Sequence, residues 1–195
     1  MAEIPNEKLC QAVLDGLRHG DFSRLAPYFV RVWGDKPLVL GLVQHECFAE
    51  HLEARTEALT CACFLGAIEV AEYLLAAGVP SEGGMATGLN AVHWATNRGQ
   101  FTAVELLLRH GVPLESRNAY GGTVLGGTVW AAVHEPRPAH PAIMEALLRA
   151  GADVREAAYP TGDTALDALL EQYGAMAPTD PGRLLTPVRR VRSAD

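Results

Sequence analysis

The sequence predicts an all-α solenoid of about four to five stacked helix–turn–helix repeats, with divergent caps at its two ends. Three observations predict this fold. Glycines recur at a fixed spacing, since Gly66 and Gly99 are 33 residues apart and so are Gly78 and Gly111. Apolar residues recur at helical spacing before these glycines, and polar capping residues precede shorter apolar runs. A period of about 20–50 residues is typical of repeat architectures, in which each unit buries its apolar face against its neighbours.

The longer helix of each repeat is predicted from an apolar face followed by a glycine. Val70, Leu74 and Leu75 lie at i, i+4 and i+5, which places them on one side of a helix. The following glycine can take the left-handed conformation that closes a helix. Three segments share this pattern: residues 72–78, 105–111 and 145–151. The last spacing, Gly111 to Gly151, is 40 residues, and an insertion near 133–141 accounts for the excess.

A shorter helix precedes each longer one. We expect it to begin at a threonine or asparagine, because such side chains accept hydrogen bonds from the unpaired amides of the first turn. The four candidate residues are Thr56, Asn90, Thr123 and Thr164. Gly66 and Gly99 then allow the tight reversal between the paired helices.

These segments resemble the ankyrin-repeat family. Residues 88–95, GLNAVHWA, are similar to the family motif G-x-T-P-L-H-x-A, with Asn for Thr, Ala for Pro and Val for Leu. Residues 121–126 and 162–167 are degenerate copies, and residues 151–154 match the family's G-A-D-V. The resemblance extends from residue 55 to about residue 174. It implies binding through a concave surface rather than catalysis, and it implies that His93 hydrogen-bonds between neighbouring turns.

The chain divides into a repeat domain, residues 1–174, and a C-terminal cap with a basic tail, residues 175–195. Within the repeat domain, residues 1–54 are expected to form a divergent N-terminal capping repeat and an insertion, and residues 55–174 the repeats, with a loop insertion near 133–141. The last 14 residues carry four arginines and one aspartate. We interpret this tail as a solvated terminus, with docking to an acidic partner or to nucleic acid as the alternative.

Composition excludes several classes of protein. The formal net charge of −7 and a pI near 5.5 disfavour a broad nucleic-acid interface, which needs a basic face. No apolar run approaches the roughly 18 residues of a spanning helix, and the first residues lack the pattern of an export signal. We therefore expect a cytoplasmic protein with no membrane segment and no cofactor, monomeric when unbound.

The four cysteines are expected to be reduced and mostly buried. Cys61 and Cys63 are two residues apart, so on a helix they point in different directions and would not share a metal ion. No other cysteine or histidine pair has metal-site spacing, and no metal ligand is predicted.

The candidate site is a protein-binding surface on the concave side of the repeats. In repeat phase, residues 64–65, 97–98 and 130–131 lie just before the reversals, and aromatic residues there or at the turn tips are typical anchors of a protein interface. The alternative is that some of them pack locally beneath the enlarged loops. The predicted partner-binding residues are Phe64, Leu65, Leu89, Asn97, Arg98, Tyr120 and Trp130.

An enzymatic function has little support in the sequence, and no catalytic residue is predicted. No nucleophile elbow, Walker loop, dinucleotide fingerprint or HExxH helix is present. The alternative hypothesis is a small-molecule-binding protein or enzyme that uses residues 33–55, with His45, Cys47 and His51, or the insertion 133–141. His134 and His140 in that insertion are expected to be solvent-exposed.

Overall fold

The computed structural model describes residues 7–30, 32–33, 36–44, 48, 51–84 and 86–177. Within this part of the chain there are ten α-helices, one 3₁₀ helix and one short antiparallel pair of strands. The elements are α1 (Glu7–Arg18), α2 (Phe22–Val30), β1 (Val32–Trp33), β2 (Lys36–Pro37), α3 (Leu38–Gln44), α4 (Leu52–Leu65), α5 (Ile68–Ala76), α6 (Ala91–Asn97), α7 (Phe101–Arg109), α8 (Val124–His134), α9 (His140–Arg149), η1 (Val154–Glu156) and α10 (Thr164–Gln172).

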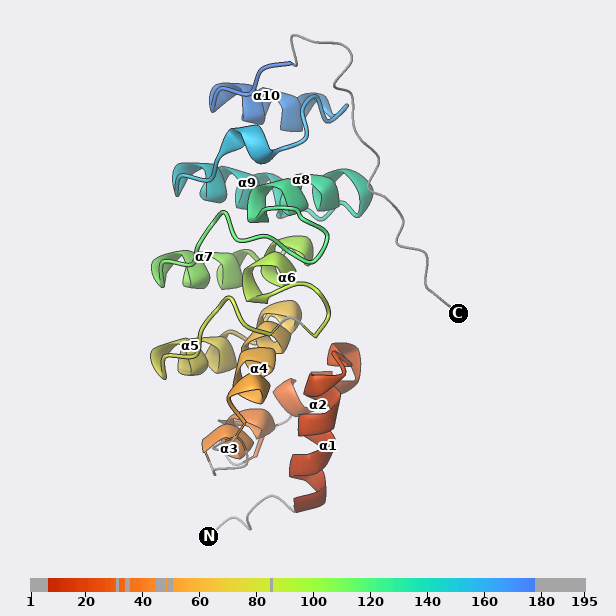
Figure 1. The fold of residues 1–195 in the computed structure, drawn as a ribbon, viewed down its shortest axis with the longest axis vertical. Helices are drawn as coiled ribbons and strands as arrows, with labels where there is room; N and C mark the ends of the chain where they lie inside the picture. Colours follow the sequence, from red (N-terminus) through yellow and green to blue (C-terminus); the bar gives the residue numbers. More distant parts are fainter. Residues whose placement is uncertain are drawn as a thin grey trace.

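Figure 1 shows the repeats stacked in two layers of helices. The inner helices α4, α6 and α8 follow one another along the stack and contact one another in that order. The outer helices α5, α7 and α9 do the same, and each inner helix packs on the outer helix of its own repeat. Buried apolar side chains run along the whole stack. The predicted all-α repeat solenoid is therefore confirmed.

Two of the predicted inner-helix starts occur as expected. The Asn90 side chain accepts a hydrogen bond from the His93 amide at 3.2 Å, and the Thr123 side chain accepts one from the Gly126 amide at 3.2 Å. Gly66 and Gly99 adopt left-handed conformations, with φ of 71° and 68°, and make the predicted reversals. α10 is capped by Asp163 rather than by Thr164, because the aspartate carboxylate reaches two amides of the first turn.

α4 begins earlier than the sequence predicts. It begins at Leu52, four residues before Thr56, and the Thr56 hydroxyl donates to the Glu53 carbonyl at 2.8 Å instead of capping the helix. Residues 52–55 are Leu, Glu, Ala and Arg, all good helix formers, so nothing in this segment ends a helix.

The two N-terminal helices cover the inner side of the first repeat. α1 and α2 both pack against α4, on the side away from α5 (Figure 1). The turn between them reaches the turn before α6, because a Cβ on Gly20 would lie 2.6 Å from Thr87 Cγ2. The segment 33–55 contains β2, α3 and the start of α4, whereas His45 and Cys47 lie outside the described residues.

The expected loop at 133–141 is shorter than predicted, because both of its ends are helical. α8 has 11 residues, compared with 7 in α6, and runs to His134, and α9 begins at His140. Only residues 135–139 are outside a helix. The expected exposure of His140 is wrong, because its side chain is buried between this loop and α6, with 1% of its surface exposed.

Two further predictions concern the basic C-terminal tail and the lack of a membrane-spanning helix. Residues 178–195, which include the basic tail, lie outside the described residues. Among the helices that the structure describes, none combines the length and the apolar character needed to cross a membrane.

Candidate functional site

Phe64 lies at the meeting point of three helices. Its ring centroid is 5.7 Å from that of Phe22 on α2 and 4.9 Å from that of Trp94 on α6, the latter edge-on. The guanidinium carbon of Arg98 lies over the same ring, 4.8 Å from its centroid. Phe64 is half-buried, and it joins α2, α4 and α6 through local packing.

Trp94 belongs to this cluster, although the sequence analysis did not single it out. Its indole N–H donates to the Thr87 hydroxyl at 2.7 Å, which fixes the ring against the turn before α6. Trp94 could have been predicted as a site residue from its position. It is a large aromatic residue at the variable position of the repeat motif, on the same helix face as Asn97. Leu65 and Leu89, both predicted partner-binding residues, are half-buried.

Trp130 and Tyr120 present large aromatic surfaces to solvent. Trp130 on α8 is 51% exposed and stacks on His134 with ring centroids 4.7 Å apart and planes 16° apart. The His134 Nδ1 is 2.8 Å from the Trp130 carbonyl oxygen, so both rings are held on the helix. Tyr120 is 70% exposed at the tip of the turn before α8.

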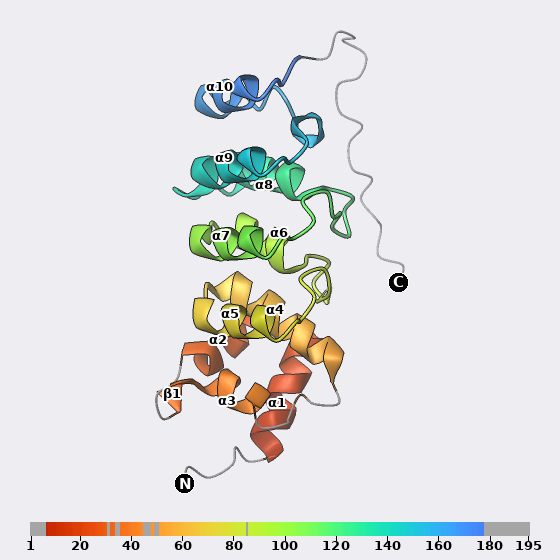
Figure 2. The ribbon, with the colours of Figure 1, turned by 90° about the vertical axis from the view of Figure 1, so that its left-hand side faces the viewer.

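The turns that carry these residues are tied to one another. The Ala119 amide donates to the Gly88 carbonyl of the preceding turn at 2.8 Å. The Asn118 side chain accepts from the amides of Tyr120 and Gly122 at 2.9 Å and 3.0 Å, which holds Tyr120 at the tip. Figure 2 shows both turns projecting on the same side of the stack. We call this side, formed by the inner helices and the turns at 86–90 and 116–123, the inner surface.

His93 is buried beneath these turns. Its Nδ1 is 2.7 Å from the Asn90 side-chain oxygen. Burial lowers the pKa of His93, and the backbone of Gly122 and Ser116 in the next turn opposes this shift. The ring therefore lies between its own helix cap and the neighbouring turn, in the place that the family resemblance implies.

Asn97 and Arg98 lie at the end of α6, where the chain reverses. The Asn97 carbonyl accepts from the His140 Nε2 at 3.2 Å, and the Arg137 amide donates to the His140 Nδ1 at 3.1 Å. This pairing places the single proton of a neutral imidazole on Nε2. Burial lowers the pKa of His140, which keeps the ring neutral near pH 7.

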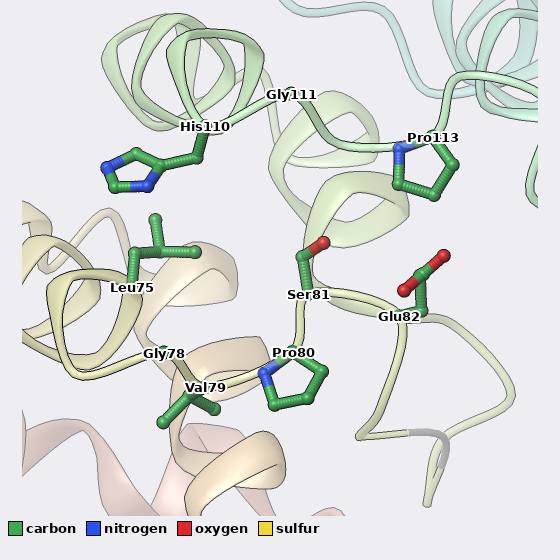
Figure 3. Close-up of a pocket in the computed structure, with 9 residues that line it drawn as sticks. All are labelled: Leu75, Gly78, Val79, Pro80, Ser81, Glu82, His110, Gly111 and Pro113. Carbon is green, nitrogen blue, oxygen red and sulfur yellow. The ribbon is translucent and has the colours of Figure 1, made fainter.

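A pocket of about 420 Å³ lies away from the inner surface, between the ends of α5 and α7 (Figure 3). Leu75, Glu82, His110 and Pro113 are among its lining residues. One repeat later, the Glu115 side chain accepts from the Asp153 amide at 2.9 Å, whereas Glu82 faces Pro113, which has no N–H to donate. The described residues contain no cluster of three or more His, Cys, Asp or Glu side chains that could hold a metal ion.

The sequence-predicted site residues therefore fall into two groups. Tyr120 and Trp130 are exposed on the inner surface, and the other five are half-buried at the ends of the inner helices or in the turns. Phe64 and Arg98 contact each other, whereas no ring contact joins Trp130 to Phe64 or Trp94 within the described chain.

Comparison with known proteins gives one family. The ankyrin repeat model matches residues 87–119, which comprise the turn before α6, α6, α7 and the start of the next turn. No curated protein shows a significant sequence match to the chain. The stacked helix pairs on both sides of the matched segment repeat its architecture, and ankyrin repeats in general mediate interactions between proteins. Residues 87–119 are therefore identified as an ankyrin repeat, and the helix pairs on both sides of them have the same architecture.

Proposed function

We propose that the chain is a non-catalytic interaction module that binds a partner protein through the inner surface, the concave side of the ankyrin stack. The observation that carries the proposal is the exposure of Trp130 and Tyr120 on neighbouring parts of that surface. Large exposed aromatic residues held on rigid supports are typical centres of a protein interface, because they bury much apolar area at a small cost in conformational entropy.

Two further features support this assignment. Val133, one turn along α8 from Trp130, is also exposed, which extends the apolar area on this helix. The α1–α2 turn contacts Thr87, so the N-terminal helices border the inner surface at the first repeat and leave α6, α8 and their turns to a partner. A regulator, adaptor, inhibitor or chaperone would use such a surface in the same way.

The test is a pull-down from cell extract with the wild-type chain and with the double variant Trp130→Ala plus Tyr120→Ala. We expect the double variant to lose most partner recovery, because each truncation removes a large contact that only the complex buries. Truncation of interface hot spots typically costs about 2 kcal/mol or more, or roughly thirtyfold in affinity.

Tyr73→Ala provides the matched control. Tyr73 is a partly exposed aromatic residue on the outer helix α5, so its removal should leave recovery unchanged. Circular dichroism spectra of all variants check that the fold is retained. Equal recovery by the wild type and the Trp130/Tyr120 variant would remove the basis of the proposal.

A further inference from the structure

Two arginines lie close to the reversal of α6 into α7 at Gly99. Arg98 is the C-terminal cap of α6, and Arg137 lies in the segment between α8 and α9. A Cβ placed on Gly99 would lie 2.9 Å from the Cβ of Arg137, so the Arg137 side chain starts directly against the residue that follows Arg98. Two cationic side chains from different repeats therefore begin next to Gly99, and that of Arg98 extends over Phe64 of α4.

Buried contacts fix this arrangement. The Arg137 amide and the Asn97 carbonyl are both hydrogen-bonded to the imidazole of His140, which is almost fully buried. Gly99 has a left-handed φ of 68°, and any larger residue would collide with Arg137. The backbone that carries Arg137 is thus positioned against the end of α6 by interactions that do not involve its guanidinium group.

No described residue occupies the N–H groups of either guanidinium. Neither forms a hydrogen bond or an ion pair with any residue in the described part of the chain, and Glu135, two residues before Arg137, does not approach it within 4 Å. Arg98 has one contact, over the face of Phe64. That contact orients the guanidinium plane, and its N–H edge, the edge that binds a carboxylate in bidentate geometry, makes no hydrogen bond to the described residues.

Of the nine arginines in the described part of the chain, four form no ion pair there: Arg55, Arg98, Arg109 and Arg137. Five other described arginines form ion pairs with acidic side chains: Arg18, Arg24, Arg117, Arg149 and Arg155. In a chain with a net charge of −7, Arg98 and Arg137 begin beside the same reversal and have no acidic partner among the described residues, so they form a local cationic site on an otherwise acidic molecule. Such a site is electrostatically complementary to an anionic group of a partner.

We propose that Arg98 and Arg137 bind the carboxylates of an acidic segment of the partner protein. This inference rests on the proposed function and names the chemistry of its partner. Trp130 lies one repeat further along, in phase with Asn97, on a helix packed against α6. The segment would therefore carry an apolar or aromatic side chain next to its acidic residues, so that the carboxylates meet the arginines while the apolar group packs on Trp130.

The observations favour a protein segment over a nucleic acid. Nucleic-acid binding needs many phosphate contacts spread over a basic face. Here the cationic site consists of two residues, and exposed apolar groups lie nearby on α8. A short acidic segment with an apolar anchor fits both features.

The test selects ligands without assuming a sequence. A displayed library of random 12-residue peptides is selected against the immobilised wild-type chain, and enriched peptides are synthesised with a fluorescent label. Binding is measured by fluorescence anisotropy to the wild type and to Arg98→Ala, Arg137→Ala, the double variant and Arg98→Lys. Arg109→Ala, an exposed arginine on the outer helix α7, is the matched control.

We expect enriched peptides to contain Asp or Glu beside an apolar residue. Each arginine substitution should weaken binding about tenfold or more, as expected for loss of a charge-assisted hydrogen bond, and Arg109→Ala should not change it. Arg98→Lys should restore binding only in part, because lysine cannot form a bidentate pair. Replacing the peptide glutamates with glutamine should weaken binding to the wild type but have little further effect on the double variant.

Several outcomes would overturn the inference. Enrichment of neutral or basic peptides would do so, and so would equal binding of acidic peptides to the wild type and the double variant. A labelled DNA or RNA oligonucleotide that binds through these arginines would assign the site to phosphate. Sedimentation velocity that shows a dimer lost in the double variant would assign it to a second copy of the chain.

The design separates this inference from the proposed function. If enriched peptides bind the double arginine variant fully but fail to bind the Trp130/Tyr120 variant, the proposed function stands and the carboxylate site is wrong. If the library yields no binding peptide, the carboxylate inference is contradicted, and the pull-down with the Trp130/Tyr120 variant decides the proposed function separately.

Discussion

Single side chains show how one position of the repeat differs between successive repeats. Asn90 and Thr123 occupy the same repeat position, and both cap an inner helix through a side-chain oxygen. In the first repeat the same position is Glu57, which lies inside the longer helix α4. Its Oε1 accepts from the Ala86 amide of the next turn at 2.8 Å, so a carboxylate here links two repeats instead of capping a helix.

A glutamate at this position places a carboxylate in the protein interior. Glu57 is 8% exposed, and its Oε2 has no hydrogen-bond partner among the described residues. Burial raises the pKa of Glu57 above its ordinary value of 4.5, the Ala86 amide opposes the shift, and the charge of Glu53 adds to it. The folded state therefore binds the proton more tightly than the unfolded state. The resulting stabilisation is complete below pH 4.5 and is lost as the pH rises through the folded pKa.

Glu57→Gln tests this account at the residue scale. The glutamine keeps a carbonyl oxygen for the Ala86 amide and removes the buried charge. We expect a higher free energy of unfolding than the wild type at neutral pH, and a difference that shrinks as the pH falls through the raised folded pKa towards 4.5 and changes no further below it. Urea unfolding of the wild type and of Glu57→Gln at several pH values measures this difference in the free energy of unfolding. A variant that is less stable than the wild type at neutral pH would contradict the prediction.

At the scale of elements, the N-terminal helices are attached to the stack through aromatic packing. Phe22, the first residue of α2, is almost fully buried and packs its ring against Phe64 of α4. The same aromatic cluster extends to Trp94 of α6. The position of α1 and α2 therefore depends on contacts between residues that are far apart in the sequence.

Phe22→Ala should loosen these helices. Removing a buried phenylalanine typically costs about 3–5 kcal/mol, because it loses the transfer energy of the ring and leaves a cavity. We expect faster hydrogen exchange in α1, α2 and α4 and little change in α9 and α10. Tyr73→Ala, on the partly exposed face of α5, is the control and should leave exchange in α1 and α2 unaltered. Unchanged protection of α1 and α2 in Phe22→Ala would show that this ring does not hold them.

At the scale of the whole molecule, the fold is a chain of contacts between successive repeats. Inner helices contact inner helices and outer helices contact outer helices, and α10 packs on α9. In such an array the free energy of unfolding is approximately the sum of the intrinsic stability of each repeat and the interaction energy between neighbouring repeats. Local damage is therefore expected to spread over one or two repeats instead of unfolding the entire molecule.

Leu170→Ala tests this expectation. Leu170 on α10 is fully buried, so its truncation should remove about 2–5 kcal/mol of local stability. Hydrogen exchange monitored by mass spectrometry should accelerate in α10 and, to a smaller extent, in α9, while α4 and α6 keep wild-type protection. A uniform loss of protection from α4 to α10 would instead indicate one cooperative core.

The sequence by itself determined the repeat architecture. Helix faces, capping residues and the reversals at Gly66 and Gly99 depend on neighbouring residues, and local order of this kind leaves a periodic pattern in the chain. The same periodicity predicted that Trp130 and Arg98 belong to the candidate binding surface. It could not say which candidates remain exposed, since that depends on what packs over each repeat.

The tertiary structure alone decided the remaining features. It placed α2 over Phe64, it buried His140 against the end of α6, and it brought Arg137 against Gly99. Each of these contacts joins residues about 40 positions apart through segments that depart from the repeat pattern, namely the N-terminal hairpin and residues 135–139. Periodicity carries no information about such segments, because their positions are set by packing against neighbouring repeats and not by local sequence order.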